Sequence, residues 1–192
     1  SPPEADLRER GWTVWTGPEW VRAQCRRGLS CIYSPEALAR TRVLAAVGGY
    51  SDALPHSADL EMWLRIAAVA GVGRINGPDQ AFRRLHPHSM MHTQFGSAGL
   101  DLHERWKAYR RFFDGPGREL PNASACEALC RQRLAQEAVD LACEVLDREG
   151  DGPAVDQLTA LAQEVAGDGA EPRWMDDIRL RRAGTAPQHP RP

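Results

Sequence analysis

The run ADLEMWLRIAAVA, residues 58–70, decides the fold that this sequence can adopt. It is apolar almost all round and ends at Gly71, so it predicts a helix that is buried on every side, as a helix packed against a sheet would be. Asp59 stands at its start, after the polar pair His56 and Ser57. A carboxylate in that place suits a general base at the mouth of a pocket, although spacing alone favours an ordinary helix cap, and one residue can do both.

On both sides of this run the pattern is mixed. Pro18 opens a short predicted helix that ends near Gly28, the stretch LSCIYS (29–34) predicts a strand, and residues 41–47 predict a helix stopped by a Gly pair. After the run, VGRIN (72–76) and QAFRRL (80–85) predict two short strands that pair antiparallel across a Gly-Pro-Asp turn. We therefore expect a helix-rich α/β fold with few strands.

From about residue 97 the apolar residues recur only at helical spacing. They predict three helical segments with the stripes Leu102, Arg105, Trp106 and Tyr109; Cys130, Leu134, Ala138, Leu141 and Val145; and Val155, Leu158, Ala162 and Val165. This divides the chain into a mixed part, 1–96, a helical extension, 97–182, and a disordered tail, 183–192. The polar, Pro-containing first twelve residues are expected to be loose as well.

Composition limits the partners. The chain has 192 residues, 24 Lys and Arg against 26 Asp and Glu, and a formal net charge of -2, which argues against nucleic acid as the main partner. The five Cys lack paired spacing, so neither a disulfide framework nor a zinc site is indicated. No membrane-span or signal-peptide pattern stands out, and we expect a cytoplasmic protein, with peripheral association at a membrane surface left open.

An ordered series of short motifs carries a resemblance to a known family. The series resembles the C-terminal, acceptor-side half of the catalytic domain of family 2 glycosyltransferases, inverting enzymes with a GT-A type fold, which show a Gly-Gly-aromatic-Asp turn, an acidic helix start with Leu-Trp-Leu-Arg, and an Arg-x-His. Here these are Gly48, Gly49, Tyr50 and Asp52; Asp59, Leu60, Glu61, Met62, Trp63, Leu64 and Arg65; and Arg84 and His86.

The resemblance implies a site and a reaction. Asp59 would be the base that deprotonates the acceptor hydroxyl, Trp63 and Arg65 would bind the acceptor, Arg84 would lie near the donor phosphates, and His86 would complete the site of a divalent metal, Mn²⁺ or Mg²⁺. The partners would be a nucleotide-sugar donor and a glycan or lipid-linked acceptor. Residues 1–96 would be the acceptor-side portion of the transferase domain.

Simpler interpretations stand beside these roles. Trp63 in an apolar helix fits the core, and Arg65 follows Glu61 by four residues, the spacing of a helix ion pair. Without the family resemblance, His86 and its neighbours His88 and His92 would be solvated. The pair Cys126 and Cys130, one turn apart, fits packing in a helical bundle.

The sequence also departs from the family pattern. Ala58 stands where many relatives have Glu, and Arg83 where an aromatic residue is frequent. No Asp-x-Asp segment of the donor-binding half is present, so we expect a fragment that is not competent alone. The alternative is a non-catalytic helical interaction module on a degenerate transferase remnant, with the helical extension as a homodimer surface.

Overall fold

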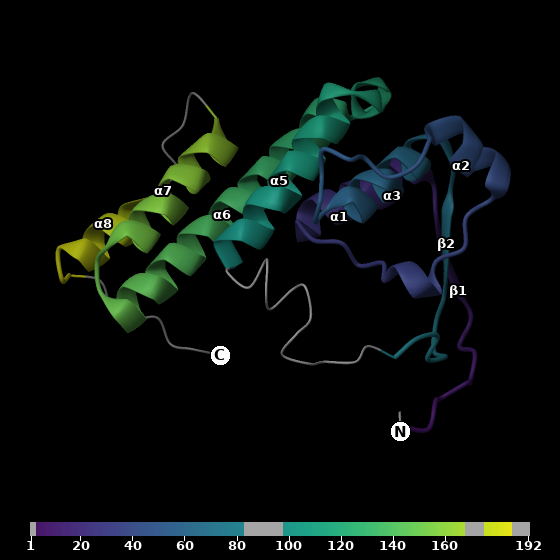
Figure 1. The fold of residues 1–192 in the computed structure, drawn as a ribbon, viewed down its shortest axis with the longest axis horizontal. Helices are drawn as coiled ribbons and strands as arrows, with labels where there is room; N and C mark the ends of the chain where they lie inside the picture. Colours follow the sequence, from purple (N-terminus) through teal and green to yellow (C-terminus); the bar gives the residue numbers. More distant parts are fainter. Residues whose placement is uncertain (1–2, 83–97, 168–174, 186–192) are drawn as a thin grey trace.

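The computed structural model describes residues 3–82, 98–167 and 175–185. Within these ranges the chain is helix-rich, as predicted, with seven α-helices and one small two-stranded antiparallel sheet. The elements in chain order are β1 Trp12–Trp15, α1 Gly17–Arg27, η1 Ser34–Glu36, α2 Thr41–Val47, α3 Ala58–Val69, β2 Val72–Ile75, α5 Ala98–Asp114, η2 Pro116–Glu119, α6 Ala123–Glu149, α7 Pro153–Ala166 and α8 Met175–Arg182 (Figure 1).

The sheet joins the start of the chain to the segment after α3. β1 and β2 run antiparallel, with Trp12 opposite Ile75 and Trp15 opposite Val72. The pairing continues beyond the strands, because the Asp79 amide donates to the Asp6 carbonyl at 2.7 Å. The expectation of a loose N-terminus is therefore wrong from Asp6 onward.

Two strand predictions also need correction. The predicted partner of β2 was the segment 80–85, yet β2 pairs with β1, and residues 80–82 form no strand. The stretch 29–34 is irregular and runs into η1, with Leu29 and Tyr33 exposed. Its composition favours a strand, but a strand needs a neighbour for its backbone groups, and no such neighbour is recorded within the described ranges.

The predicted helix boundaries of the first half are confirmed, and they follow from local chemistry. Thr16 precedes α1 and donates from its amide and hydroxyl to the Glu19 carboxylate at 2.8 and 2.7 Å. The side-chain hydrogen bond from Thr16, followed by the backbone one, lowers the pKa of Glu19. Gly28 ends α1 in the left-handed conformation, with φ 72°, and its amide bonds the Gln24 carbonyl.

The helix that decides the fold, α3, is buried by other helices. Leu60, Leu64 and Ala67 are almost or fully inaccessible, and α3 packs on α1, α2 and α5. The prediction of a buried helix is confirmed, but the predicted sheet neighbour is replaced mainly by α1 and α5. Close approach is possible at Gly17, where a Cβ would lie 1.7 Å from the Ala67 carbonyl oxygen.

The main hydrophobic cluster crosses the sequence boundary at residue 96. Trp20, Val21 and Leu64 belong to the same cluster as Tyr109 and Leu134. The long helices α5 and α6 lie in the middle of the molecule, between the α1 and α3 pair on one side and α7 and α8 on the other (Figure 1). The two sequence segments thus share one core.

The far end of the helical part has a second cluster. It combines Leu102, Val139 and Val155 with residues of α8, a helix that the stripes did not predict. All five Cys are free thiols, and Cys126 and Cys130 are buried as the packing interpretation predicted. None of the helices in the described ranges is long and apolar enough to cross a membrane.

Candidate functional site

Asp59 lies in the first turn of α3. Ser57 holds the N-cap position, so Asp59 is not the cap residue itself, and its carboxylate Oδ1 accepts a hydrogen bond from the Leu60 amide at 2.6 Å. The side chain is half-buried. A carboxylate in this turn is favoured by the positive end of the helix dipole and still has lone pairs to accept a further proton.

The loop before Asp59 is tied to the helical part by a chain of charged groups. His56 Nε2 lies 2.9 Å from Asp101 Oδ1, and Asp101 accepts from Arg105 Nε at 2.8 Å. The Arg105 guanidinium also donates to the Gly28 carbonyl at 2.7 Å and to Glu137 at 2.6 Å. Because Arg105 is buried and engages α1, α5 and α6 together, the loop that leads to Asp59 has a fixed anchor.

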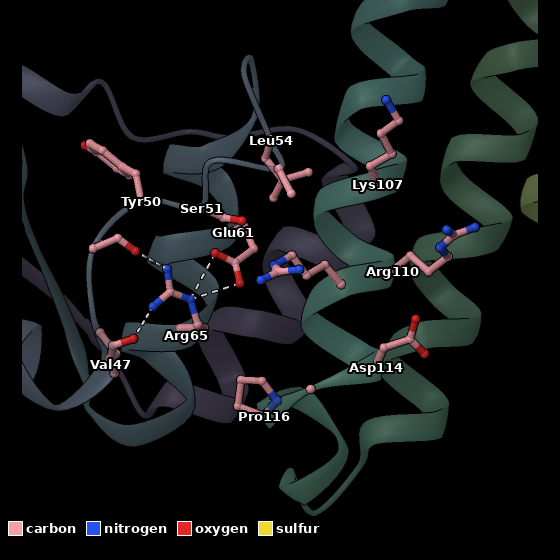
Figure 2. A pocket seen from close by; sticks show the side chains of 14 residues that line it. Val47, Tyr50, Ser51, Leu54, Glu61, Arg65, Lys107, Arg110, Asp114 and Pro116 are labelled. Carbon is pink, nitrogen blue, oxygen red and sulfur yellow. Dashed lines mark hydrogen bonds and ion pairs between the residues drawn. The ribbon is translucent and has the colours of Figure 1, made fainter.

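The Arg65 guanidinium is engaged entirely in hydrogen bonds within the protein. Its Nε lies 2.9 Å from both oxygens of Glu61, which confirms the predicted ion pair. The other guanidinium nitrogens donate to the carbonyls of Val47, Gly48 and Gly49, at the end of α2. Figure 2 shows Arg65 between Glu61 and Val47. A cation is favoured at the carbonyl end of a helix, so Arg65 holds the Gly-Gly turn onto α3.

Trp63 belongs to the main core, in line with its packing interpretation. Its indole Nε1 is buried and has no hydrogen-bond partner among the described residues. It follows Asp59 by one helical turn, so the two residues share a side of α3. A stacking contact with a sugar stays a prediction.

The remaining predicted site residues cannot be placed. Arg84 and His86 lie outside the described residues, as do His88 and His92. Within the ranges that are described, no three His, Cys, Asp or Glu side chains come together as a metal site. The predicted Mn²⁺ or Mg²⁺ therefore stays a prediction that depends on His86.

Asp59 and Arg65 face different sides of α3. Successive helix residues turn by about 100°, so Glu61 points about 200° away from Asp59. Glu61 and Arg65 instead line a pocket of about 770 Å³ that sequence reasoning missed. Its lining is Val47, Gly49, Tyr50, Ser51, Ala53, Leu54, Glu61, Arg65, Lys107, Arg110, Arg111, Asp114, Gly115 and Pro116 (Figure 2).

The pocket combines residues that are far apart in the sequence. One wall is the turn 49–54, and the other is the last two turns of α5 with the start of η2. The only sequence signal for the second wall is the spacing of Lys107 and Arg111, one turn apart on a predicted helix. Such a pair is normally a solvated helix face, so only the fold identifies it as part of a pocket.

Comparison of the chain with protein-family models, with curated proteins and with solved structures gave no match. Any functional assignment therefore depends on the motif series and on the geometry of the described residues.

Proposed function

We propose that this chain supplies the acceptor side of an inverting, family 2-like glycosyltransferase. The observation that carries the proposal is the position of Asp59: a half-buried carboxylate in the first turn of a buried helix, behind an anchored loop. The motif series Gly-Gly-Tyr, Asp-Leu-Glu-Met-Trp-Leu-Arg and Arg-Leu-His supports the same assignment. The GT-A type fold expected from the resemblance is part of this proposal.

The proposed reaction is a single displacement. The acceptor hydroxyl gives its proton to the Asp59 carboxylate while its oxygen attacks the anomeric carbon of the donor sugar. The bond between that carbon and the phosphate oxygen breaks, and the nucleoside diphosphate leaves with the electron pair. A carboxylate positioned for this proton transfer typically contributes a factor of about 10²–10⁴ to the rate.

Two polar networks would keep the base in place. His56, Asp101 and Arg105 fix the loop before α3, and Arg65 fixes the Gly-Gly turn on its other side. Both networks are built from charged hydrogen bonds, which hold geometry better than neutral ones. We assign Arg65 a positioning role, because its guanidinium is engaged by Glu61 and by the carbonyls of the Gly-Gly turn on a different side of α3 from Asp59.

The donor side is proposed to come from a separate donor-binding half, because the chain has no Asp-x-Asp segment. The proposed partners are a nucleotide-sugar donor and a glycan or lipid-linked acceptor, and the proposed location is cytoplasmic, at or near a membrane surface. The divalent metal that the resemblance implies, with His86 as a ligand, stays a prediction, because His86 lies outside the described residues.

The test is the Asp59→Asn substitution in the enzyme that includes the proposed donor-binding half, with sugar transfer from nucleotide sugars as the assay. Asn keeps the oxygen that accepts from the Leu60 amide but cannot take the proton, so we expect transfer to fall by about 10²–10⁴ with donor affinity and melting temperature unchanged. Asp140→Asn, an exposed carboxylate on α6, is the matched control. Near-normal transfer by Asp59→Asn would contradict the proposal.

A second candidate is the non-catalytic helical interaction module, whose predicted homodimer surface on the helical extension stays a prediction; the exposed apolar side chains that favour an interaction module lie instead on the first part of the chain. Trp12, Val14 and Leu38 are 60%, 73% and 102% exposed. Sedimentation of the chain at several concentrations tests this candidate. A concentration-dependent homodimer would support the module, and a chain that stays monomeric at every concentration, or that forms a tight complex with a nucleotide sugar and Mn²⁺, would count against it.

A further inference from the structure

The surface between α1 and α2 carries a local excess of positive charge. Residues 20–51 include five Arg and one acidic residue, although the formal net charge of the whole chain is -2. The acidic residue, Glu36, accepts a hydrogen bond from the Tyr33 amide at 3.2 Å and forms no ion pair with any described residue. The five Arg are exposed, and their side chains have no hydrogen-bond or ion-pair partner among the described residues: Arg22, Arg26, Arg27, Arg40 and Arg42. These cations are available to a partner of opposite charge.

Residues 37–40 bring one of these cations together with an exposed apolar side chain. Ala37 and Ala39 are partly buried and pack against the main core. Leu38, between them, is 102% exposed, and Arg40 is exposed as well. The backbone is extended at both Ala37 and Arg40, and side chains alternate along extended backbone. Leu38 and Arg40 therefore project from the same side of the segment, away from the core.

The stretch 29–33 presents apolar side chains next to the basic end of α1. Leu29, two residues after the last Arg of α1, is 44% exposed, and Tyr33 is 58% exposed. Ile32 packs against the main core, and the Cys31 thiol donates to Gln24 Oε1 of α1 at 3.2 Å. In Figure 1 the chain between α1 and α2 runs along the border of the molecule rather than between helices. The stretch is thus held in place while Leu29 and Tyr33 face solvent.

We propose that the segment 26–40 docks on an anionic membrane, with its Arg side chains on the lipid phosphates and Leu29, Tyr33 and Leu38 in the apolar part of the interface. A membrane surface offers anionic phosphates directly beside hydrocarbon, which matches the cations and apolar side chains of this segment. A nucleic acid attracts the same Arg but has no hydrocarbon region to cover Leu38. The proposal gives the proposed membrane location a definite surface, and it does not rest on the transferase reaction, since vesicle binding requires no catalysis.

The experiment is flotation of the full 192-residue chain with lipid vesicles at low and at high salt. One set of vesicles contains phosphatidylcholine alone, and the other contains a mixture of phosphatidylcholine and phosphatidylserine. We expect the chain to float with the anionic vesicles and to bind the neutral ones more than about tenfold more weakly. High salt should weaken binding to the anionic vesicles, because it screens the attraction between Arg and lipid.

Matched variants locate the surface. Each Arg near an anionic membrane strengthens binding about fivefold, so the double variant Arg26→Gln and Arg27→Gln should weaken it more than tenfold. Its control is the double variant Arg118→Gln and Arg148→Gln, which removes the same charge from two exposed Arg of the helical part.

The apolar contact has its own pair of variants. Leu38→Ser changes a fully exposed residue, so it should leave the melting temperature unchanged and weaken binding to anionic vesicles several-fold. Leu180→Ser, at an exposed Leu on α8, is its control.

Three results of the flotation assay overturn the proposal. They are a chain that does not bind anionic vesicles, a control double variant that weakens binding as much as the Arg26 and Arg27 variant, and a Leu38→Ser chain that binds like the parent. Binding to single-stranded RNA that the Arg26 and Arg27 variant loses, without any binding to vesicles, would instead identify a nucleic acid as the partner.

Discussion

The two halves of the molecule bury their apolar residues to very different extents. Along α6 and α7 the predicted stripes are enclosed, with Leu134, Val155 and Val165 fully inaccessible. Before α2, by contrast, Trp12 and Leu38 stand largely in solvent. The helical part thus encloses most of its predicted stripes, partly beneath α1 and α3, whereas the first part obtains its core by packing α1 and α3 onto α5 and α6 and leaves large apolar side chains exposed.

The largest expected difference in the free energy of unfolding is between two Leu→Ala substitutions, one at a buried and one at an exposed position. Leu64→Ala removes a fully buried side chain from the shared core and should lower the free energy of unfolding by about 3 kcal/mol. Leu38→Ala, at a fully exposed position, should change it by less than about 0.5 kcal/mol. Urea unfolding followed by circular dichroism measures both. Equal effects would show that the first half is not held by the shared core.

An intermediate loss of stability is expected when the hydrogen bonds of Arg105, which connect the two parts of the chain, are removed. Arg105→Met keeps most of the volume but removes the donors to Asp101, Gly28 and Glu137. We expect a loss of about 2 kcal/mol, less than for a fully buried pair because both carboxylates keep some solvent contact. Arg133→Met, at a half-exposed Arg on α6, is the control. Equal midpoints in urea for the two variants would contradict the bridge.

The smallest effect concerns one hydroxyl in the same junction. Tyr109 is fully buried and donates to the Gln24 carbonyl at 3.0 Å, so Tyr109→Phe should cost about 1 kcal/mol at neutral pH. Burial raises the pKa of Tyr109 well above its ordinary value.

The raised pKa of Tyr109 also predicts a pH dependence. Its stabilising contribution is complete below the ordinary tyrosine pKa of about 10 and is lost above it, where the unfolded chain releases the proton first. The difference in unfolding free energy between the parent and Tyr109→Phe should therefore be constant from pH 7 to 9 and shrink near pH 10.5. A difference that grows with pH would contradict the assignment.

Much of the helical structure was predictable because its signals are local. Pro18 and Gly28 bracket α1, and Gly48 stops α2 where expected. The strands were not predictable in the same way, since β1 has four residues and finds its partner about sixty positions later. The stretch 29–34 has the composition of a strand, but it is irregular because no partner strand lies beside it within the described residues.

In the candidate site, too, the features that depend on local spacing could be predicted and those that depend on distant contacts could not. The helix start at Asp59 and the pair of Glu61 with Arg65 follow from spacing along one helix, and both could be predicted. The grip of Arg65 on the Gly-Gly turn depends on where α2 ends in space. The α5 wall of the pocket depends on how a helix more than forty residues away is packed, which periodicity does not encode.

The length of α6 has a consequence for how the molecule comes apart. Its 27 residues span about 40 Å, and it contributes Cys130 and Leu134 to one cluster and Val139 and Cys143 to the other. Because both hydrophobic clusters need α6, unfolding of either end of this helix should also destabilise the cluster at the other end. The described parts of the chain should thus behave as one cooperative folding unit, in which damage at one end is felt at the other.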